Sequence, residues 1–249
     1  MLDLICRAAS GTGFTFLMTT LGAATVFFLA KTPDERGQRG MIGFAAGVMT
    51  AASIWSLLLP AVEQSEAEGR VPGWLPAGLG LLAGVVFLVL LDEALRRLHP
   101  GAGADSNALL MTAITLHNIP EGMAVGLAFA LAEEGPEFVA AATLALGIGI
   151  QNFPEGAAVS LPLRQAGLSR FRAFLGGMLS GAVEPLFGVL VVLAAAGVRA
   201  AMPWLLSFAA GAMLYVVVAE LVPQAHSRAG TAGFVAGFLL MMVLDIALS

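Results

Sequence analysis

The sequence predicts an all-α polytopic membrane protein with eight transmembrane helices, and three observations support this fold class. Hydrophobic residues make up 58% of the 249 residues and charged residues only 12%, which is about half the usual share of charge in a soluble domain. The mean hydropathy is +0.89, and the 30 glycines are typical of closely packed membrane helices. The apolar residues also fall into long segments separated by short, charged connections.

Eight of these apolar segments are long enough to cross a bilayer as a helix. Their approximate bounds are 10–30, 40–62, 74–95, 107–131, 137–162, 172–197, 202–223 and 230–248. The connections are too short to hold a soluble domain, so residues 1–249 are predicted to form a single membrane domain. Arg7 is the only basic residue before the first segment. We interpret this segment as an uncleaved helix because it is long enough to span. The single cysteine, Cys6, excludes an internal disulfide.

The distribution of Lys and Arg predicts the orientation, because cytoplasmic loops are enriched in these residues. If the sides alternate along the chain, nine of the 12 basic residues fall on one side, which we expect to be cytoplasmic. They are Lys31, Arg36, Arg39, Arg96, Arg97, Arg164, Arg170, Arg172 and Arg228. Both termini are then expected outside, in the plasma (inner) membrane if the source is bacterial. No basic run suggests a nucleic-acid partner. The outer loops are acidic, either to concentrate cations or as ordinary solvated charge.

Two similar six-residue stretches lie within the fourth and fifth apolar segments. Residues 117–122 read His-Asn-Ile-Pro-Glu-Gly, and residues 151–156 read Gln-Asn-Phe-Pro-Glu-Gly. Polar and ionisable groups are costly inside a membrane and are kept there mainly for function. In the first stretch His117 and Glu121 are four positions apart and share a helix face with Asn118 close by. The second stretch repeats this arrangement with Gln151, Asn152 and Glu155.

The prolines and glycines of these stretches also predict unusual helices. Pro120 and Pro154 cannot donate backbone hydrogen bonds, so each helix is expected to kink and to free a carbonyl. Gly122 and Gly156 permit the close approach of a neighbouring helix. The two segments run in opposite directions, so the stretches form an inverted pair near the midplane, as in many secondary transporters.

Five acidic residues lie inside predicted spans, where each ionised carboxylate costs roughly 2.5–3.5 kcal/mol. They are Glu121, Glu155, Glu184, Glu220 and Asp245. The spans of the central three contain no Lys or Arg to pair with them. Either protons or a bound cation must neutralise these glutamates, and a metal site accounts for them most economically.

The two stretches resemble the motifs of the ZIP (Zrt/Irt-like) family of divalent-metal transporters, and as a pair they are similar to its GufA-type branch. The resemblance extends over essentially the whole chain and implies eight helices with both termini outside. It also implies a two-metal centre. The ligands it implies for the first metal are His117, Glu121, Gln151 and Glu155. Those for the second are Asn118, Glu121, Asn152, Glu155 and Glu184, the only acid of the sixth span.

The resemblance assigns further positions outside the two motifs. The second segment carries Met49, which in GufA-type members can contact the first metal, and on the same face Ser53 and Ser56, which we interpret as lining the pathway. Glu220 and His226 are expected near the cytoplasmic exit, and Asp245 near the outer entrance. Because neutral amides bind divalent cations more weakly than carboxylates, the second metal is expected to bind more weakly than the first.

The predicted function is therefore transport of a divalent transition metal into the cytoplasm, chiefly zinc. The mixed nitrogen and oxygen ligands also suit iron, manganese or cadmium. The family resemblance implies an elevator-type sliding of helices one, four, five and six against the others, and a homodimer within the lipid bilayer. Two alternatives stay open. An intramembrane zinc hydrolase is disfavoured because the sequence has no HExxH motif, so we do not expect an enzyme. A proton-coupled transporter of an organic solute would use the carboxylates as proton relays.

Overall fold

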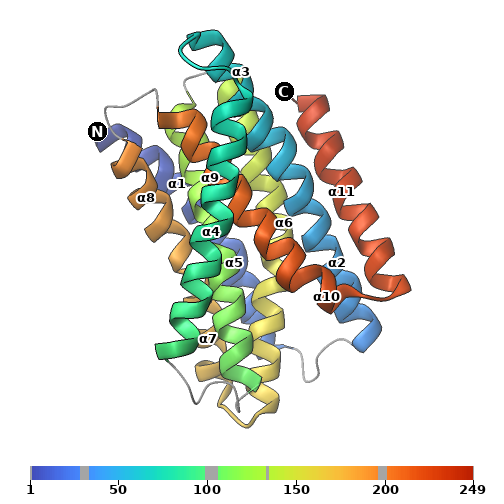
Figure 1. Cartoon of the computed structure of the whole chain (residues 1–249). Coiled ribbons are helices and arrows are strands. Elements are labelled where there is room, and N and C mark those ends of the chain that lie inside the picture. The colour runs from blue at the N-terminus through green and yellow to red at the C-terminus, as the bar shows by residue number, and fades with distance from the viewer. Residues whose placement is uncertain (1, 29–33, 99–105, 133–134, 196–200, 249) are drawn as a thin grey trace.

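The computed structural model of the chain describes residues 2–28, 34–98, 106–132, 135–195 and 201–248, and in these ranges it contains helices and no strand (Figure 1). Some side chains within these ranges, including that of His117, lie outside the described part. The α-helices are α1 (Leu2–Ala24), α2 (Glu35–Ala52), α3 (Leu59–Glu68), α4 (Trp74–Leu98), α5 (Ser106–Leu131), α6 (Pro136–Gln165), α7 (Arg170–Gly181), α8 (Val183–Ala195), α9 (Met202–Val216), α10 (Val222–Ala225) and α11 (Arg228–Leu248). Helix occupies each of the eight apolar segments.

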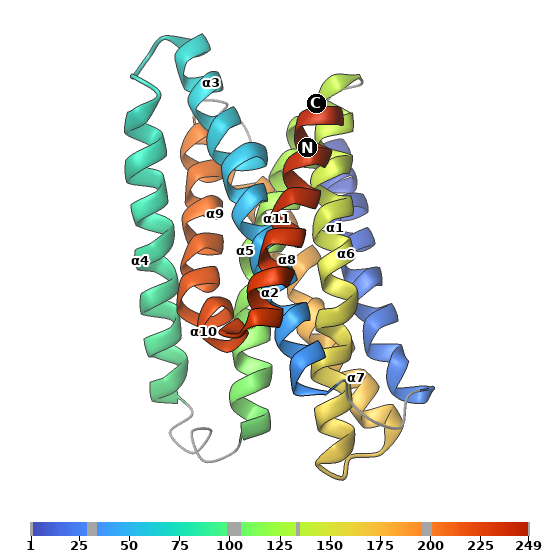
Figure 2. The ribbon, with the colours of Figure 1, turned by 90° about the vertical axis from the view of Figure 1, so that its right-hand side faces the viewer.

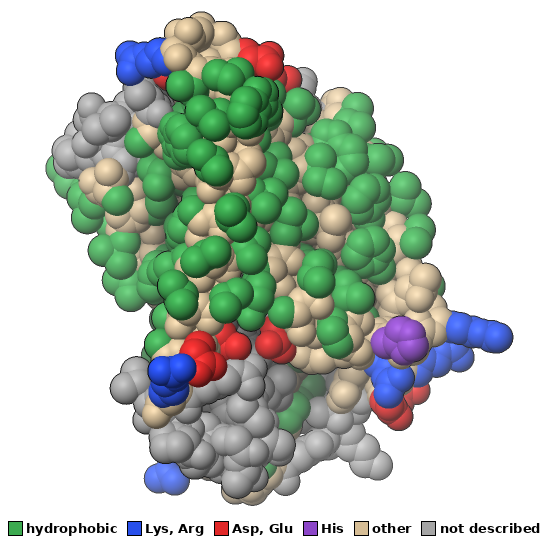
Figure 3. Space-filling model, viewed as in Figure 1, with side chains coloured by type: hydrophobic (Ala, Val, Ile, Leu, Met, Phe, Trp, Pro, Cys, Tyr) green, Lys and Arg blue, Asp and Glu red, His purple; other side chains and the backbone are tan. Residues whose placement is uncertain are grey.

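Five helical stretches of the described chain are long and apolar enough to cross a membrane. They are Glu35–Glu68, Trp74–Ala94, Arg170–Ala194, Met202–Ala225 and Arg228–Ala247. On α4, Leu82 and Leu90 are 56% and 64% exposed, which suits a surface that faces lipid. Figure 3 shows charged side chains gathered toward two ends of the visible face, with a largely hydrophobic band between them. The protein is therefore an all-helical, multi-pass membrane protein.

The helices pack as two bundles. The first bundle consists of α1, α5, α6, α7 and α8, which contact one another extensively. In the second bundle α2 pairs with α11 and α4 pairs with α9, and α3 and α10 join these pairs. In Figure 2, α4 and α9 lie on one side of the molecule and α1, α6 and α7 on the other. Apart from α5 against α9 and α6 against α2 and α11, the main packing is within a bundle.

Glycines bring the backbones into contact within each bundle. A Cβ on Gly22 of α1 would lie 1.9 Å from the carbonyl oxygen of Phe153, and one on Gly156 of α6 would lie 2.0 Å from that of Thr19. In the second bundle, a Cβ on Gly47 of α2 would lie 2.1 Å from the carbonyl oxygen of Phe234 on α11. No side chain fits at these positions, so glycine sets the helix spacing.

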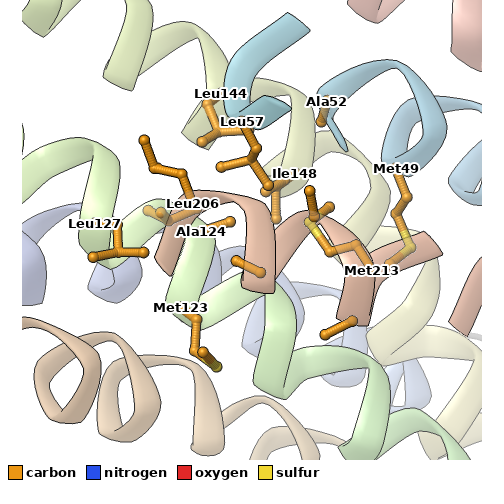
Figure 4. Packing of buried hydrophobic residues seen from close by; sticks show 14 of the residues in the cluster. Met49, Ala52, Leu57, Met123, Ala124, Leu127, Leu144, Ile148, Leu206 and Met213 are labelled. Carbon is orange, nitrogen blue, oxygen red and sulfur yellow. The ribbon is translucent and has the colours of Figure 1, made fainter. Parts of the chain in front are cut away.

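Between the bundles, contact is made by apolar side chains instead. Figure 4 shows Met49 of α2 and Met213 of α9 in the same buried cluster as Ile148 of α6 and Leu127 of α5. Where α6 meets α11, the nearest atoms to a Cβ on Gly147 belong to the side chain of Met241, with its sulfur at 2.2 Å. The surface between the bundles is therefore apolar and rich in flexible methionine.

Irregular turns occur where the sequence analysis did not place them. Two π-helical turns, η2 (Ser53–Leu58) and η5 (Val217–Leu221), interrupt the second and seventh apolar segments. Each turn just precedes a proline, Pro60 or Pro223, which cannot donate to the carbonyl four residues earlier, and a wider turn relieves the resulting clash. Pro120 and Pro154 lie within continuous α-helix, in α5 and α6, and the kinks expected at these prolines stay a prediction. A short 3-10 turn, η1 (Thr25–Phe27), extends α1.

Both termini lie at the same end of the molecule (Figures 1 and 2). The turn between α3 and α4 is also at this end, and the turn between α6 and α7 is at the opposite end. A chain whose ends lie on the same side crosses the molecule an even number of times.

Candidate metal site

The two sequence motifs meet inside the first bundle. The Gln151 side chain of α6 donates a hydrogen bond from Nε2 to Oε1 of Glu121 on α5. Both side chains are fully buried. Glu155 lies one turn along α6 from Gln151, at a partly buried position. Three residues that the sequence predicts as ligands of the first metal are thus adjacent, and His117 belongs to the same stretch of α5.

Glu184 lies against the other side of this group. It is fully buried in the first turn of α8, where the positive end of the helix dipole favours a carboxylate. Asn152 of α6 donates from Nδ2 to Oε2 of Glu184 at 3.0 Å. Thr19 of α1 donates from Oγ1 to Oε1 at 3.0 Å. The structure therefore brings the predicted ligand of the sixth span to the second motif.

The first motif also has a fixed amide. Asn118 of α5 is fully buried and donates from Nδ2 to the backbone oxygen of Ser180 on α7, at 2.8 Å. Gly122 lies one turn further along α5, where a Cβ would lie 2.3 Å from the backbone oxygen of Glu184. This close approach, which the sequence predicts for Gly122, holds α5 against the start of α8.

The hydrogen bonds leave a consistent set of oxygens behind. All three amide nitrogens donate to fixed acceptors, as described above for Asn118, Gln151 and Asn152. Their amide oxygens, together with Oε2 of Glu121, are buried without a hydrogen-bond partner among the described atoms. A buried acceptor without a partner costs about 1–3 kcal/mol, so four in one region require an explanation. Carboxylate and amide oxygens bind cations as well as hydrogen-bond donors.

The three glutamates of this region also lie close together. The carboxylates of Glu121, Glu155 and Glu184 lie close enough to repel one another. The ion pairs found among the described residues instead join side chains near helix ends, such as Arg97 with Glu93 on α4. In the part of the chain with described side chains, no three His, Cys, Asp or Glu residues form a metal cluster by themselves. Any ion bound by the described side chains here would need the amide oxygens in addition to the carboxylates.

The remaining predicted residues lie in the second bundle. Met49 is 1% exposed and belongs to the apolar cluster of Figure 4, and Ser53 donates to its carbonyl oxygen at 2.7 Å. Ser56 donates to Oδ1 of the buried Asp245 at 2.7 Å, which joins η2 to α11. The second bundle thus places Met49 at the surface between the bundles and the Ser56–Asp245 pair between two of its own helices.

The two residues predicted near the exit lie at the end of the seventh segment and just after it. Glu220 is partly buried in the π-helical turn η5. His226 is exposed just after α10, and its backbone oxygen accepts a hydrogen bond from Arg39 at 3.1 Å. Glu220 and His226 are six positions apart in the sequence, and His226 is the more exposed of the two.

Sequence reasoning missed the contribution of α1. Thr12, Thr15 and Thr19 are all fully buried, and the hydroxyls of Thr15 and Thr19 both lie within reach of the Glu184 carboxylate. Their spacing of three and four places them on one helical face, a periodicity that indicates a polar stripe directed at the protein interior. Ser160 of α6, also fully buried with no hydrogen-bond partner among the described atoms, was missed as well.

Comparison with known proteins identifies the family of this chain. The model of the family described as ZIP zinc transporter matches residues 98–245, from the end of α4 to α11. The zinc transporter ZIP11 of Homo sapiens is 35% identical over 98% of this chain and 98% of its own length. The zinc transporter GufA of Myxococcus xanthus is 38% identical over 92% of this chain and 94% of its own. The zinc transporter ZIPB of Bordetella bronchiseptica is 40% identical over 97% and 81%. The chain therefore belongs to the ZIP zinc transporter family, which consists of transport proteins and not of enzymes.

Proposed function

We propose that the protein transports zinc across the membrane into the cytoplasm through an ion site between α5, α6 and α8. One observation carries this proposal. The amide nitrogens of Asn118, Gln151 and Asn152 all donate to protein acceptors, and their amide oxygens are buried without a hydrogen-bond partner among the described atoms. A cation satisfies such oxygens, whereas a proton on a carboxylate satisfies at most one of them. The relatives described above are named as zinc transporters.

The proposed ion site has two unequal halves. The first ion is bound by His117, Glu121, Gln151 and Glu155, with Met49 as a further contact. The second shares Glu121 and Glu155 and adds Asn118, Asn152 and Glu184. The second half binds more weakly, because it relies on the neutral amides of Asn118 and Asn152, and neutral amides bind divalent cations more weakly than carboxylates. Iron, manganese and cadmium suit the same mixed ligands.

We also propose that the chain crosses the membrane eight times with both termini outside. The termini lie at one end of the molecule (Figures 1 and 2). Exposed arginines lie at helix ends that face the opposite end, and enrichment in arginine is typical of the cytoplasmic side. Examples are Arg97 at the end of α4, Arg164 at the end of α6, and Arg172 at the start of α7.

Transport is proposed to proceed by sliding of the first bundle against the second. Support comes from the difference between the two kinds of contact. Within a bundle, glycines such as Gly22 and Gly156 place backbone against backbone, and such contacts cannot shift without separating the helices. Between bundles, flexible side chains such as Met241 and Met213 form the surface, and a packed apolar surface of this kind permits shear between helices.

A cross-link between the bundles is expected to stop transport. We would replace Gly147 and Met241 by cysteine in a Cys6→Ser background, because the side chain of Met241 occupies the space beside Gly147, so the two positions face each other directly across the bundles. The oxidised double variant is expected to lose zinc uptake and to regain it on reduction. Each single cysteine variant treated with the same oxidant serves as the control. Full uptake by the cross-linked protein would exclude sliding at this surface.

Uptake of radiolabelled zinc by proteoliposomes tests the proposed function directly. Liposomes that contain the protein are expected to accumulate zinc faster than empty ones, and a double variant, His117→Ala with Glu121→Ala, is expected to match the empty liposomes. Unchanged uptake by that variant would overturn the assignment of the ion site. Competition by cadmium, iron and manganese then ranks the transported ions.

A further inference from the structure

The polar stripe of α1 has no role in the ligand set proposed above, yet Thr12, Thr15 and Thr19 are all fully buried. Two of the three hydroxyls donate to carbonyl oxygens of their own helix, although that of Thr15 also lies near the Glu184 carboxylate. Thr12 donates to the carbonyl oxygen of Ala8 at 2.7 Å, and Thr15 donates to that of Thr12 at 3.0 Å. Such bonds are the common way for a helix to satisfy a buried threonine.

For Thr19, the carboxylate of Glu184 on α8 is nearer than the carbonyl oxygen of its own helix. Its Oγ1 lies 3.0 Å from Oε1 of Glu184 and 3.3 Å from the carbonyl oxygen of Thr15. A hydroxyl has one proton to donate, and a bond to a carboxylate is about twice as strong as one to a neutral acceptor. The shorter distance and the charge therefore both assign this proton to Glu184.

The position of Thr19 is fixed by glycines of the neighbouring helices. A Cβ on Gly181 of α7 would lie 2.8 Å from Cγ2 of Thr19 and 3.1 Å from its Oγ1. A Cβ on Gly156 of α6 would lie 2.0 Å from its carbonyl oxygen. Since threonine is also stiff at χ1, the hydroxyl is held in one direction.

Glu184 is thus oriented from two sides. Thr19 of α1 donates to Oε1, and Asn152 of α6 donates to Oε2. Two donors on different helices fix the plane of the carboxylate and leave each oxygen with further lone pairs for a cation. Partners that orient a metal ligand in this way commonly set its affinity for the metal.

We propose that Thr19 is a positioning residue for transport, whose hydroxyl orients the Glu184 carboxylate toward the transported divalent cation. This inference rests on the proposed function and assigns to α1 a chemical role in addition to packing. It also explains why α7 and α6 present glycines to this threonine, because a larger residue at Gly181 would displace the hydroxyl from its acceptor.

The central variant is Thr19→Val, which keeps the branched shape and removes the donor. We expect the zinc concentration for half-maximal uptake to rise about 10-fold, as for other residues that orient metal ligands, with a smaller change in the maximal rate. Thr19→Ser retains the donor and is expected to remain within about 2-fold of the unmodified protein. Thr20→Val is the matched control, because Thr20 donates only to the carbonyl oxygen of Phe16 on its own helix, at 2.9 Å.

A double-mutant cycle separates orientation of Glu184 from a general effect on packing. In a Glu184→Gln background, Thr19→Val is expected to change the half-maximal zinc concentration by less than about 2-fold, because the two residues act as one unit. Isothermal titration of zinc into the detergent-purified variants provides a second measure, and their thermal midpoints report folding.

Three results would overturn the inference. They are a Thr19→Val protein with unchanged affinity, a Thr19→Ser protein as impaired as Thr19→Val, and a Thr19→Val effect of full size in the Glu184→Gln background. A different result would show that the proposed function itself is wrong: zinc uptake would then survive Glu121→Gln. If Glu121→Gln abolishes uptake and Thr19→Val does not affect it, only the role of Thr19 is wrong.

Discussion

Glu121→Gln is expected to abolish zinc uptake, with a loss of more than about 100-fold, since loss of even an outer partner of a metal ligand costs roughly 10–100-fold. Glu121 of the first motif is fully buried where the two motifs meet. One of its oxygens accepts a hydrogen bond from Gln151, and the other has no hydrogen-bond partner among the described atoms. The substitution preserves the size of the side chain but replaces an anionic ligand by a neutral one. Initial rates of radiolabelled zinc uptake into proteoliposomes measure the effect.

The control for this variant is Glu63→Gln, which removes one negative charge from an exposed position on α3. It is expected to retain uptake, whereas Glu121→Gln loses it at the same net charge of the protein. The elution volume in detergent and the thermal midpoint should be normal for both variants. Because Gln removes a buried, repelling carboxylate, Glu121→Gln is expected to fold at least as stably as the unmodified chain. Retention of most of the uptake would contradict our choice of ion site.

Gly22→Ala is expected to destabilise the first bundle strongly. The new methyl group would lie 1.9 Å from the carbonyl oxygen of Phe153, so α1 and α6 must separate or bend. Overpacking of this kind costs about 1–3 kcal/mol or more. The same displacement moves the second motif, because Asn152 precedes Phe153 directly, so zinc uptake should fall as well. Thermal denaturation in detergent measures the stability of the variant.

Gly13→Ala is the matched control for this substitution. Gly13 lies on the same helix, and a Cβ at that position meets no atom within 4 Å. Alanine in a helix interior is favoured over glycine by about 1 kcal/mol, so Gly13→Ala should be neutral or slightly stabilising. The two variants are expected to differ in thermal midpoint by about 2–12 °C, from an overpacking cost of about 1–3 kcal/mol at about 2–4 °C per kcal/mol for a chain of this size. Equal midpoints would show that glycine at position 22 does not set the helix spacing.

The predicted segments agree with the helices to within a few residues at most ends. The fourth segment, predicted over 107–131, is α5 (Ser106–Leu131), and the fifth, predicted over 137–162, is α6 (Pro136–Gln165). Apolar length determines these elements, because a chain in lipid must pair its backbone groups within each segment. The start of α1 at Leu2 rather than residue 10 is the largest difference, since the preceding residues, which include the charged Asp3 and Arg7, are also helical.

Local irregularity was harder to predict. Proline is the usual signal of a disturbed helix, and π-helical turns precede Pro60 and Pro223, whereas Pro120 and Pro154 lie within continuous α-helix. The same residue type gives different turns because neighbouring helices decide which backbone distortion can be packed. That information is absent from a single segment of sequence.

The sequence by itself determined where the helices lie, and it identified two polar motifs and a separate glutamate that a membrane protein has to neutralise. Only the tertiary structure decided how these groups use their hydrogen bonds. Asn118 donates to the backbone oxygen of Ser180. Asn152 and Thr19 both donate to the carboxylate of Glu184. These partners come from helices far apart in the chain, so no local pattern reveals them. What remains after these bonds are made is a set of buried oxygens without hydrogen-bond partners among the described atoms, and these oxygens are the basis of the proposed cation site.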